Sequence, residues 1–229
     1  MKYTSARLHV GTMTLLAFVA LVPTFRRANV YQDPLAILDR ASSSFDTVKT
    51  LAADFTQVVE NPMLGDPDTT RGRLFQRRPN YFAMRFTDPK GDRVVADGKK
   101  LWLYTPSTTP GQVIRTDIPG MGTTGPNLIG QFVDHPRTRY RSRYVDDALL
   151  MDGPAVVIEL IPVVLPMDVP YSSATVWISR NDGLIRRIDI EEKSGQRRTI
   201  ILQNLKVNQP VPAREFRFSP TSGVRVVDQ

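Results

Sequence analysis

Apolar and polar residues alternate with a period of two along most of this chain from about residue 53 onward, and no other feature constrains its fold as strongly. Phe82, Met84 and Phe86 fall on one face of a strand, because successive side chains of a strand point to opposite faces. Asp97-Gly98 lies between two such runs and favours a two-residue hairpin, since both residues tolerate a positive φ. Strand-like runs separated by short turns predict one antiparallel sheet that curls toward a barrel.

Two segments depart from this pattern and predict helices. Asp33 followed by Pro34 is typical of a helix start, because an aspartate caps the first turn and proline lacks an N–H that would go unpaired there. A second, short apolar helix is expected at Gly125–Val133. The first helix should run for about four to five turns, because apolar residues recur there at helical spacing: Leu35, Leu38, Ala41, Phe45, Val48 and Leu51.

Residues 1–28 have the layout of a secretory signal segment. Lys2 and Arg7 precede an apolar run, Val10–Val22, whose helical length of about 20 Å is short of the ~30 Å hydrocarbon core of a membrane. We expect residues 29–229 to form a single domain. Arg26-Arg27 after the apolar run leaves two alternatives open, an uncleaved anchor and a misplaced start codon.

The positive charge of the chain, +7 in total, lies largely in that leader. Of the 30 lysines and arginines, four lie in residues 1–28, which hold no acidic residue. The remaining 26 basic and 23 acidic side chains give a net charge of only +3. We therefore expect no nucleic-acid partner, because such proteins usually show a stronger basic excess.

The residue types that most often carry catalysis are scarce. The chain has no cysteine and two histidines, so it offers no thiol nucleophile, no thiolate metal site and no multi-histidine metal centre. Gly120–Gly125 matches G-x-G-x-x-G, but prolines flank it and the surrounding chain alternates like a sheet, so we interpret it as a loop. His135 stands alone and is interpreted as structural. The sequence predicts no enzyme, no cofactor and no metal.

Two surface features remain open between a structural and a functional interpretation. Arg137, Arg139, Arg141 and Arg143 alternate with uncharged residues, which would place four guanidinium groups on one face of a strand. That face is either solvated, a docking surface for an acidic partner or lipid headgroups, or a nucleic-acid groove. Ile161–Tyr171 is apolar with three prolines, and is either a contact surface or a loop folded over the core.

Four segments, in order from about residue 33 to the end, resemble the LolA-type outer-membrane lipoprotein carrier proteins. Arg77–Phe82 reads Arg-Arg-Pro-Asn-Tyr-Phe and is similar to that family's Lys/Arg-Arg-Pro-Asn-x-Phe segment. Val95–Tyr104 resembles its D-G-K-x-L-W-x-Y hairpin, and Leu51–Gln57 its F-T-Q element. Phe216–Val224 resembles its F-x-F-x-P-x-x-G-V ending.

The resemblance implies a mainly β, α+β fold: a half-open, unclosed antiparallel β-barrel around an apolar cavity, covered by a helical lid. It also implies a periplasmic carrier that receives acylated lipoproteins from an inner-membrane lipoprotein-releasing ABC transporter and delivers them to an outer-membrane lipoprotein receptor. We expect the protein to be a monomer. The alternative is an envelope sensor of lipid or lipoprotein, or a structural module of the same fold, that does not shuttle cargo.

The resemblance also assigns roles to single residues. Arg78 maps to the arginine that latches the lid through hydrogen bonds to lid backbone. Met84 stands where relatives often have an aromatic residue, and the lid around Gly125–Asn127 is more polar than expected. Partner or headgroup contacts are expected at the four arginines named above. The predicted acyl cavity and lid comprise Phe45, Phe55, Phe82, Met84, Phe86, Trp102, Tyr104, Leu128, Ile129 and Phe132.

Overall fold

The computed structural model describes residues 33–63, 65–118, 126, 128–163 and 169–229. The predicted signal segment of residues 1–28 lies outside these residues, as do the Gly120–Gly125 loop and the centre of the apolar connection, residues 164–168. The leader therefore stays a prediction.

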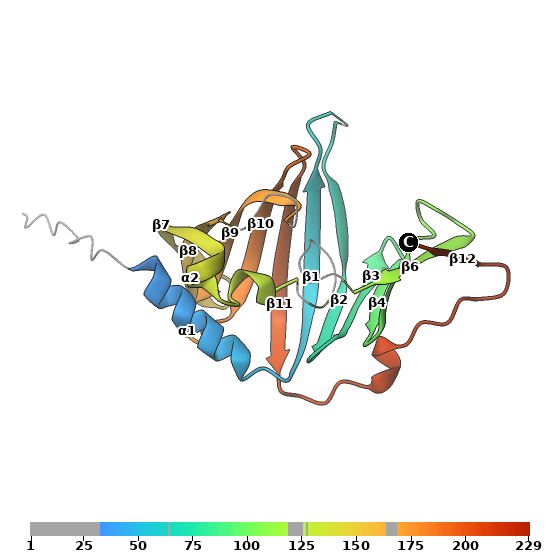
Figure 1. Ribbon diagram of the computed structural model, residues 1–229, viewed down its shortest axis with the longest axis horizontal. Coiled ribbons are helices and arrows are strands. Elements are labelled where there is room, and N and C mark those ends of the chain that lie inside the picture. The colour runs from blue at the N-terminus through green and yellow to red at the C-terminus, as the bar shows by residue number, and fades with distance from the viewer. Residues whose placement is uncertain (1–32, 64, 119–125, 127, 164–168) are drawn as a thin grey trace, which may run out of the picture. The chain divides into compact units, whose positions relative to one another are not determined.

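Twelve strands of the described chain form one sheet (Figure 1), in the spatial order β12-β6-β5-β4-β3-β2-β1-β11-β10-β9-β8-β7. The strands are β1 (Thr50–Glu60), β2 (Asp68–Arg77), β3 (Tyr81–Asp88), β4 (Arg93–Asp97), β5 (Lys100–Tyr104), β6 (Gln112–Asp117), β7 (Tyr140–Leu150), β8 (Gly153–Pro162), β9 (Tyr171–Ser179), β10 (Ile185–Glu192), β11 (Arg197–Val207) and β12 (Arg225–Asp228).

The sheet is not closed, since β12 and β7 form its two edges. This confirms the mainly β, half-open architecture. The expectation of a purely antiparallel sheet is wrong at one edge, where β12 pairs with β6 in parallel. The reason is that the chain leaves β11, passes through the short 3₁₀ helix η2 (Ala213–Phe216) and returns beside β6 without a hairpin. A long connection of this kind permits a parallel pair, which a two-residue turn does not.

The predicted hairpin turn is confirmed. The loop of two residues that joins β4 to β5 is Gly98-Lys99, one position later than predicted, because Asp97 is the last residue of β4. Gly98 has a φ of +96°. Asp97 fixes the turn further, because its Oδ1 accepts hydrogen bonds from the Lys99 and Lys100 amides, each at 2.9 Å. Burial alone would raise the pKa of Asp97, but these bonds and one from the Trp102 indole lower the pKa overall.

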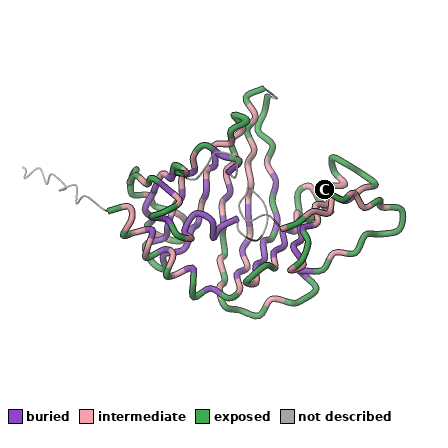
Figure 2. Tube along the Cα trace, in the orientation of Figure 1, coloured by how far each residue is buried: buried purple, intermediate pink, exposed green. Residues whose placement is uncertain are grey.

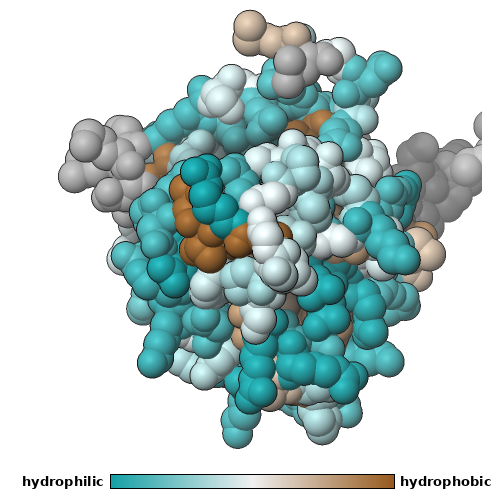
Figure 3. Space-filling model, turned by 90° about the vertical axis from the view of Figure 1, so that its right-hand side faces the viewer, coloured by the Kyte–Doolittle hydropathy of each residue, from teal (hydrophilic) through white to brown (hydrophobic). Residues whose placement is uncertain are grey.

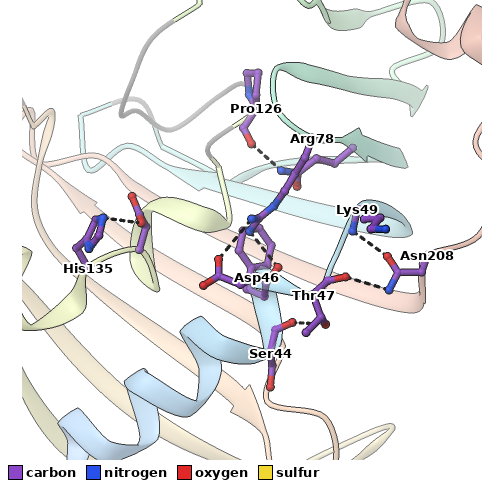
Figure 4. Close-up of polar contacts among 11 residues, drawn as sticks. Ser44, Asp46, Thr47, Lys49, Arg78, Pro126, His135 and Asn208 are labelled. Carbon is purple, nitrogen blue, oxygen red and sulfur yellow. Dashed lines mark hydrogen bonds and ion pairs between the residues drawn. The ribbon is translucent and has the colours of Figure 1, made fainter.

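The first helix, α1 (Pro34–Asp46), begins as predicted but is shorter. Asp33 caps it by accepting a hydrogen bond from the Leu35 amide at 2.9 Å. The helix ends at Asp46, and the linker that follows is held by Asn208, which accepts from the Lys49 amide and donates to the Thr47 carbonyl (Figure 4). Tertiary contacts thus end the helix before its apolar spacing does, and Leu51 lies in β1 instead.

The main core lies between one face of the sheet, here called the inner face, and a cover made of α1 and residues 128–133. Buried positions recur at every second residue along the first half of β1 and much of β9, whereas β3, β4 and β8 each contain three or more consecutive buried residues (Figure 2). From α1 the core receives Leu38, Ala41 and Phe45. From the strands it receives mostly branched aliphatic side chains, among them Ile158, Val176 and Ile188.

The opposite, outer face carries a smaller apolar cluster. Phe75, Ala83 and Val95 lie there under Phe216 of η2. The C-terminal connection thus covers part of the outer face while α1 covers the inner one. The end of the molecule that carries β6 and β12 is mostly hydrophilic, with one compact hydrophobic patch (Figure 3).

Candidate functional site

Four of the predicted cavity residues lie together on the inner face. Phe55 of β1 and Phe82 and Met84 of β3 are buried in the main core. Phe86 is partly buried against the same core, and its ring meets the Phe55 ring edge-on, with centroids 5.2 Å apart. The period-two pattern places them there because β1 and β3 flank β2 in the sheet.

The predicted lid residues approach the same face from the other side. Phe45 at the end of α1 and Leu128, Ile129 and Phe132 are all buried in the core that contains Phe82. The predicted short helix is only one turn of 3₁₀ helix, η1 (Gly130–Phe132). Gly125 and Asn127 lie outside the described residues. In this state the lid side chains fill the space between the two layers.

Trp102 and Tyr104 lie elsewhere, and their expected place in the cavity is wrong. Along β5, Leu101 and Leu103 point to the inner core, so Trp102 and Tyr104 point to the outer face. Both rings lie 5.5 Å from the Phe218 ring, measured between centroids. The alternation was correct, but the sequence alone did not tell which set of side chains faces inward.

Arg78 connects the sheet to the lid, as Figure 4 shows. Its Nη2 donates a hydrogen bond of 2.9 Å to the Phe45 carbonyl, and its Nη1 lies 3.4 Å from Asp46 Oδ1. The guanidinium carbon lies 4.4 Å from the centroid of the Phe45 ring. Arg78 follows directly after β2, and its own amide donates to the Lys49 carbonyl at 3.0 Å. One side chain therefore contacts the backbone, ring and charge at the end of α1.

Gln76, two residues earlier on β2, makes a second contact with the cover. Its side chain is buried, with 5% of the residue exposed, and its Nε2 donates to the Pro126 carbonyl at 3.0 Å. Its Oε1 is also buried and has no hydrogen-bond partner among the described residues. Sequence reasoning missed Gln76. The available signal in the sequence was its spacing. Gln76 is a polar residue two positions from Leu74 and from Arg78, so it shares their face of the strand.

A cleft of about 430 Å³ opens beside these two side chains. It lies between the end of α1, the end of β2 and the start of η1. Polar and apolar groups alternate around it: Ser42, Phe45, Asp46, Gln76, Arg78, Pro79, Asn80, Ile118, Pro126, Gly130, Val133 and Asp134. The cleft thus lies beside Arg78 and Gln76, where the sheet meets the end of α1 and the start of η1.

A buried pair of tyrosines supports the far end of the cover. Tyr140 donates to the Gln131 carbonyl at 2.9 Å, and the Tyr140 and Tyr171 hydroxyls lie 2.8 Å apart. Because Tyr140 donates its hydroxyl hydrogen to the Gln131 carbonyl, Tyr171 must be the donor between the two hydroxyls. Burial raises the pKa of both phenols, and the neighbouring Tyr140 adds to this effect on Tyr171. Both groups therefore stay neutral hydrogen-bonding partners.

The four arginines do not share one strand face, so that expectation is wrong. Arg137 and Arg139 lie in the four-residue helix α2 (Pro136–Arg139), and only Arg141 and Arg143 lie in β7. The helix begins because His135 adopts a left-handed conformation (φ +49°) immediately before Pro136, whose fixed φ suits a first helical turn.

Three of these arginines have acidic partners within the chain. Arg137 Nη2 lies 2.6 Å from Asp39 Oδ2 and joins α2 to α1. Arg139 pairs with Asp134 at 3.1 Å, and Arg143 with Glu159 at 2.9 Å. Arg137 and Arg143 are exposed, so their ion pairs each contribute at most about 1 kcal/mol to stability. The side chain of Arg139 is only 25% exposed. The ion pairs of Arg137 and Arg139 hold α2 in position, and the arginines that form the three pairs do not make a free basic surface.

The described residues contain no group of three or more histidines, cysteines and acidic residues placed to hold a metal ion. No helix in the described ranges is long and apolar enough to cross a membrane. What the site offers chemically is a large apolar surface with two hydrogen-bonding side chains at its opening.

Comparison with known proteins agrees with this geometry. A family model described as outer membrane lipoprotein carrier protein LolA matches residues 46–219. The outer-membrane lipoprotein carrier protein of Pectobacterium carotovorum subsp. carotovorum (strain PC1) is 28% identical over 215 residues, covering 93% of this chain and 97% of that protein. That of Pasteurella multocida (strain Pm70) is 26% identical over 216 residues, covering 94% and 97%.

A solved structure shares the fold. It is an uncharacterized conserved protein from Thermus thermophilus, with a TM-score of 0.53 at 14% identity. The match covers 86% of this chain and all of that one. At this identity the likeness concerns the fold alone.

Proposed function

The chain belongs to the LolA family of outer membrane lipoprotein carrier proteins, and from this membership we propose that it carries lipoproteins through the periplasm with their acyl chains held between its lid and the inner face of its sheet. Moving an acyl chain from a membrane into water costs about 0.8 kcal/mol per CH₂. A carrier therefore needs an apolar surface that can be covered and uncovered. It needs no catalytic group.

The observation that carries this proposal is the latch between Arg78 and the end of α1. The inner face around Phe55, Phe82 and Met84 is the apolar surface, and Phe45 covers it while Arg78 holds the Phe45 carbonyl. Charge-assisted hydrogen bonds contribute about 1.5–3 kcal/mol net. A latch of that strength keeps the empty protein closed and still lets cargo displace the lid, since switching needs states only a few kcal/mol apart.

We propose the rest of the route on the basis of the same membership. An inner-membrane lipoprotein-releasing ABC transporter supplies the cargo, an outer-membrane lipoprotein receptor accepts it, and the carrier travels between them as a monomer. Among the four arginines expected to meet partners or headgroups, Arg141 is exposed on β7. It is the one whose charge we assign to partner contact, because Arg137, Arg139 and Arg143 are engaged by carboxylates of the chain itself.

The variant Arg78→Leu tests the latch. We expect the protein to stay folded and to lose the hydrogen bond to Phe45. The lid then opens more readily, which favours the loaded state over the empty closed state, so delivery of bound lipoprotein to acceptor membranes slows. The measurement is the rate of transfer of a labelled lipoprotein from the purified carrier. Arg71→Leu is the matched control, because Arg71 is an exposed residue of β2, the strand that Arg78 follows, and its partner, Asp88, is not in the lid. Transfer by Arg78→Leu at the wild-type rate would contradict the proposal.

A further inference from the structure

We propose that Gln76 forms a subsite at the cleft whose Oε1 accepts a hydrogen bond from the amide N–H of an acylated peptide, while its Nε2 stays bonded to the Pro126 carbonyl. The inference rests on the proposed function, because it concerns the polar part of the same cargo. It differs from the Arg78 latch in the residue, in the lid segment and in the chemical group recognised.

The hydrogen-bonding state of Gln76 is the first observation. Its Nε2 donates to the Pro126 carbonyl at 3.0 Å, while its Oε1 is buried without a partner in the described part of the chain. Leaving a buried acceptor unpaired destabilises a protein by about 1–3 kcal/mol. Native structures rarely keep such a group unless it has another use.

The lid segment explains why only half of the side chain is satisfied. A primary amide such as that of Gln76 presents a donor and an acceptor side by side. Pro126 supplies an acceptor, but proline has no N–H to donate in return. A trans secondary amide cannot pair with both groups of Gln76, because its carbonyl and its N–H point in opposite directions. Its N–H can instead donate to Oε1 while Nε2 stays bonded to the Pro126 carbonyl, so the ligand supplies the hydrogen bond that the lid leaves unmade.

The surroundings place this side chain where a ligand can reach it. Gln76 and Pro126 line the same 430 Å³ cleft as Arg78, and in Figure 4 Pro126 and Arg78 lie close to each other above the end of α1. On one side the cleft meets the apolar inner face through Phe45 and Val133. An acylated peptide has this same order of groups, a hydrocarbon chain that ends in a carbonyl or an amide.

The consequence is selectivity for the linkage next to the acyl chain. A site that hydrogen-bonds a ligand N–H discriminates strongly against an analogue that lacks it, because the site's own polar group then stays unpaired. Loading with an amide-linked chain gives Oε1 a hydrogen-bond donor, the ligand N–H. Loading with an ester-linked chain leaves Oε1 unpaired, as it is in the empty protein.

The test uses two probes that differ in one group. N-palmitoylglycine carries the amide, and O-palmitoylglycolic acid replaces its N–H with an ester oxygen. Dissociation constants for both are measured by calorimetry with the full mature protein, wild type and Gln76→Met. We expect the wild type to bind the amide at least fivefold more tightly than the ester, and Gln76→Met to bind the two equally. Gln57→Met is the control, because Gln57 lies on the neighbouring strand β1 with its amide near Thr70.

The outcomes separate the subsite from the carrier function. Equal binding of amide and ester by the wild type overturns the subsite and leaves the carrier proposal standing. A preference for the amide that persists in Gln76→Met has the same consequence. Failure of the wild type to bind either probe overturns both proposals. The comparison of probes on the wild type needs no substitution, so a folding defect of Gln76→Met does not affect it.

Discussion

At the scale of single residues, the Tyr140–Tyr171 pair makes stability depend on alkaline pH. Burial raises the pKa of both phenols in the folded protein above the ordinary value of 10.0. Above pH 10 the unfolded chain loses protons that the folded protein keeps, so unfolding becomes more favourable. Each such tyrosine lowers the free energy of unfolding by about 1.4 kcal/mol per pH unit in that range. Urea denaturation between pH 8 and pH 11 measures this slope.

The matched variants are Tyr140→Phe and Tyr140→Phe with Tyr171→Phe. The single variant should be less stable at pH 8 by about 1–3 kcal/mol, because the buried Gln131 carbonyl and Tyr171 hydroxyl each lose the Tyr140 hydroxyl as a partner. The double variant should lose most of the slope above pH 10. An unchanged slope in the double variant would assign the alkaline sensitivity to other groups.

Residues also show where sequence reasoning succeeds. The N-cap at Asp33 and the turn at Gly98 were predictable because each depends on a few neighbouring residues. Gln76 was not, because its importance depends on Pro126, fifty positions away in the chain. Trp102 was misplaced for a related reason: alternation tells which residues share a face, and only tertiary packing tells which face is inside.

At the scale of elements, a reversible cross-link can test whether α1 moves during loading. A Cβ placed on Gly183, in the β9–β10 turn, would lie 3.2 Å from the Cβ of Ser44 in α1. Disulfides need about 3.5–4.5 Å between these atoms, so a small shift accommodates the bond. Gly183 has a φ of +74°, which costs a cysteine there about 1–2 kcal/mol. The chain has no cysteine, so the engineered pair is the only one.

We expect the oxidised Ser44→Cys, Gly183→Cys protein to take up little acylated cargo and the reduced protein to regain uptake. The measurement is binding of a fluorescent acylated peptide before and after reduction. Ser44→Cys alone, treated in the same way, controls for the oxidant. Equal uptake by cross-linked and reduced protein would show that loading does not require α1 to leave the turn.

The two helical elements differ from their predictions for identifiable reasons. The apolar spacing of α1 continues to Leu51, but Asn208 binds the linker at Thr47 and Lys49 and the chain enters β1. The arginine segment alternates like a strand, but the left-handed His135 followed by proline starts α2. Local periodicity was thus overruled in α1 by the two side-chain hydrogen bonds of Asn208, and in α2 by the backbone conformation of His135.

At the scale of the whole molecule, carrier and sensor predict different material in the purified protein. We expect protein isolated from its native envelope to be released without detergent, free of its leader and partly loaded with acylated polypeptide, which mass spectrometry identifies. The oxidised cross-linked variant, isolated in parallel, should carry little. Protein that keeps its leader, stays with the membrane and carries no acylated material would instead favour the sensor.

The topology of the sheet marks the limit of prediction at this scale. Consecutive strands pair through turns or short connections in two runs, β1 to β6 and β7 to β11, and local signals predict such antiparallel runs. The two runs are joined by a long-range pair, β1 with β11, which brings Leu51 beside Val207. The pairing of β12 with β6 joins residues 113 positions apart, as between Arg115 and Asp228. No local pattern encodes such a pair. The resemblance of separate segments to a known family provided the overall fold, which periodicity alone left incomplete.

The position of Phe132, Leu128 and Ile129 in the core has a further consequence for any attempt to improve this protein. In the proposed mechanism these side chains occupy the surface that cargo must reach, so the lid would act as a tethered competitor of every ligand. Each 1.4 kcal/mol added to the closed state weakens apparent affinity about tenfold. Substitutions selected for a higher melting temperature of the empty protein at these positions should therefore yield poorer carriers.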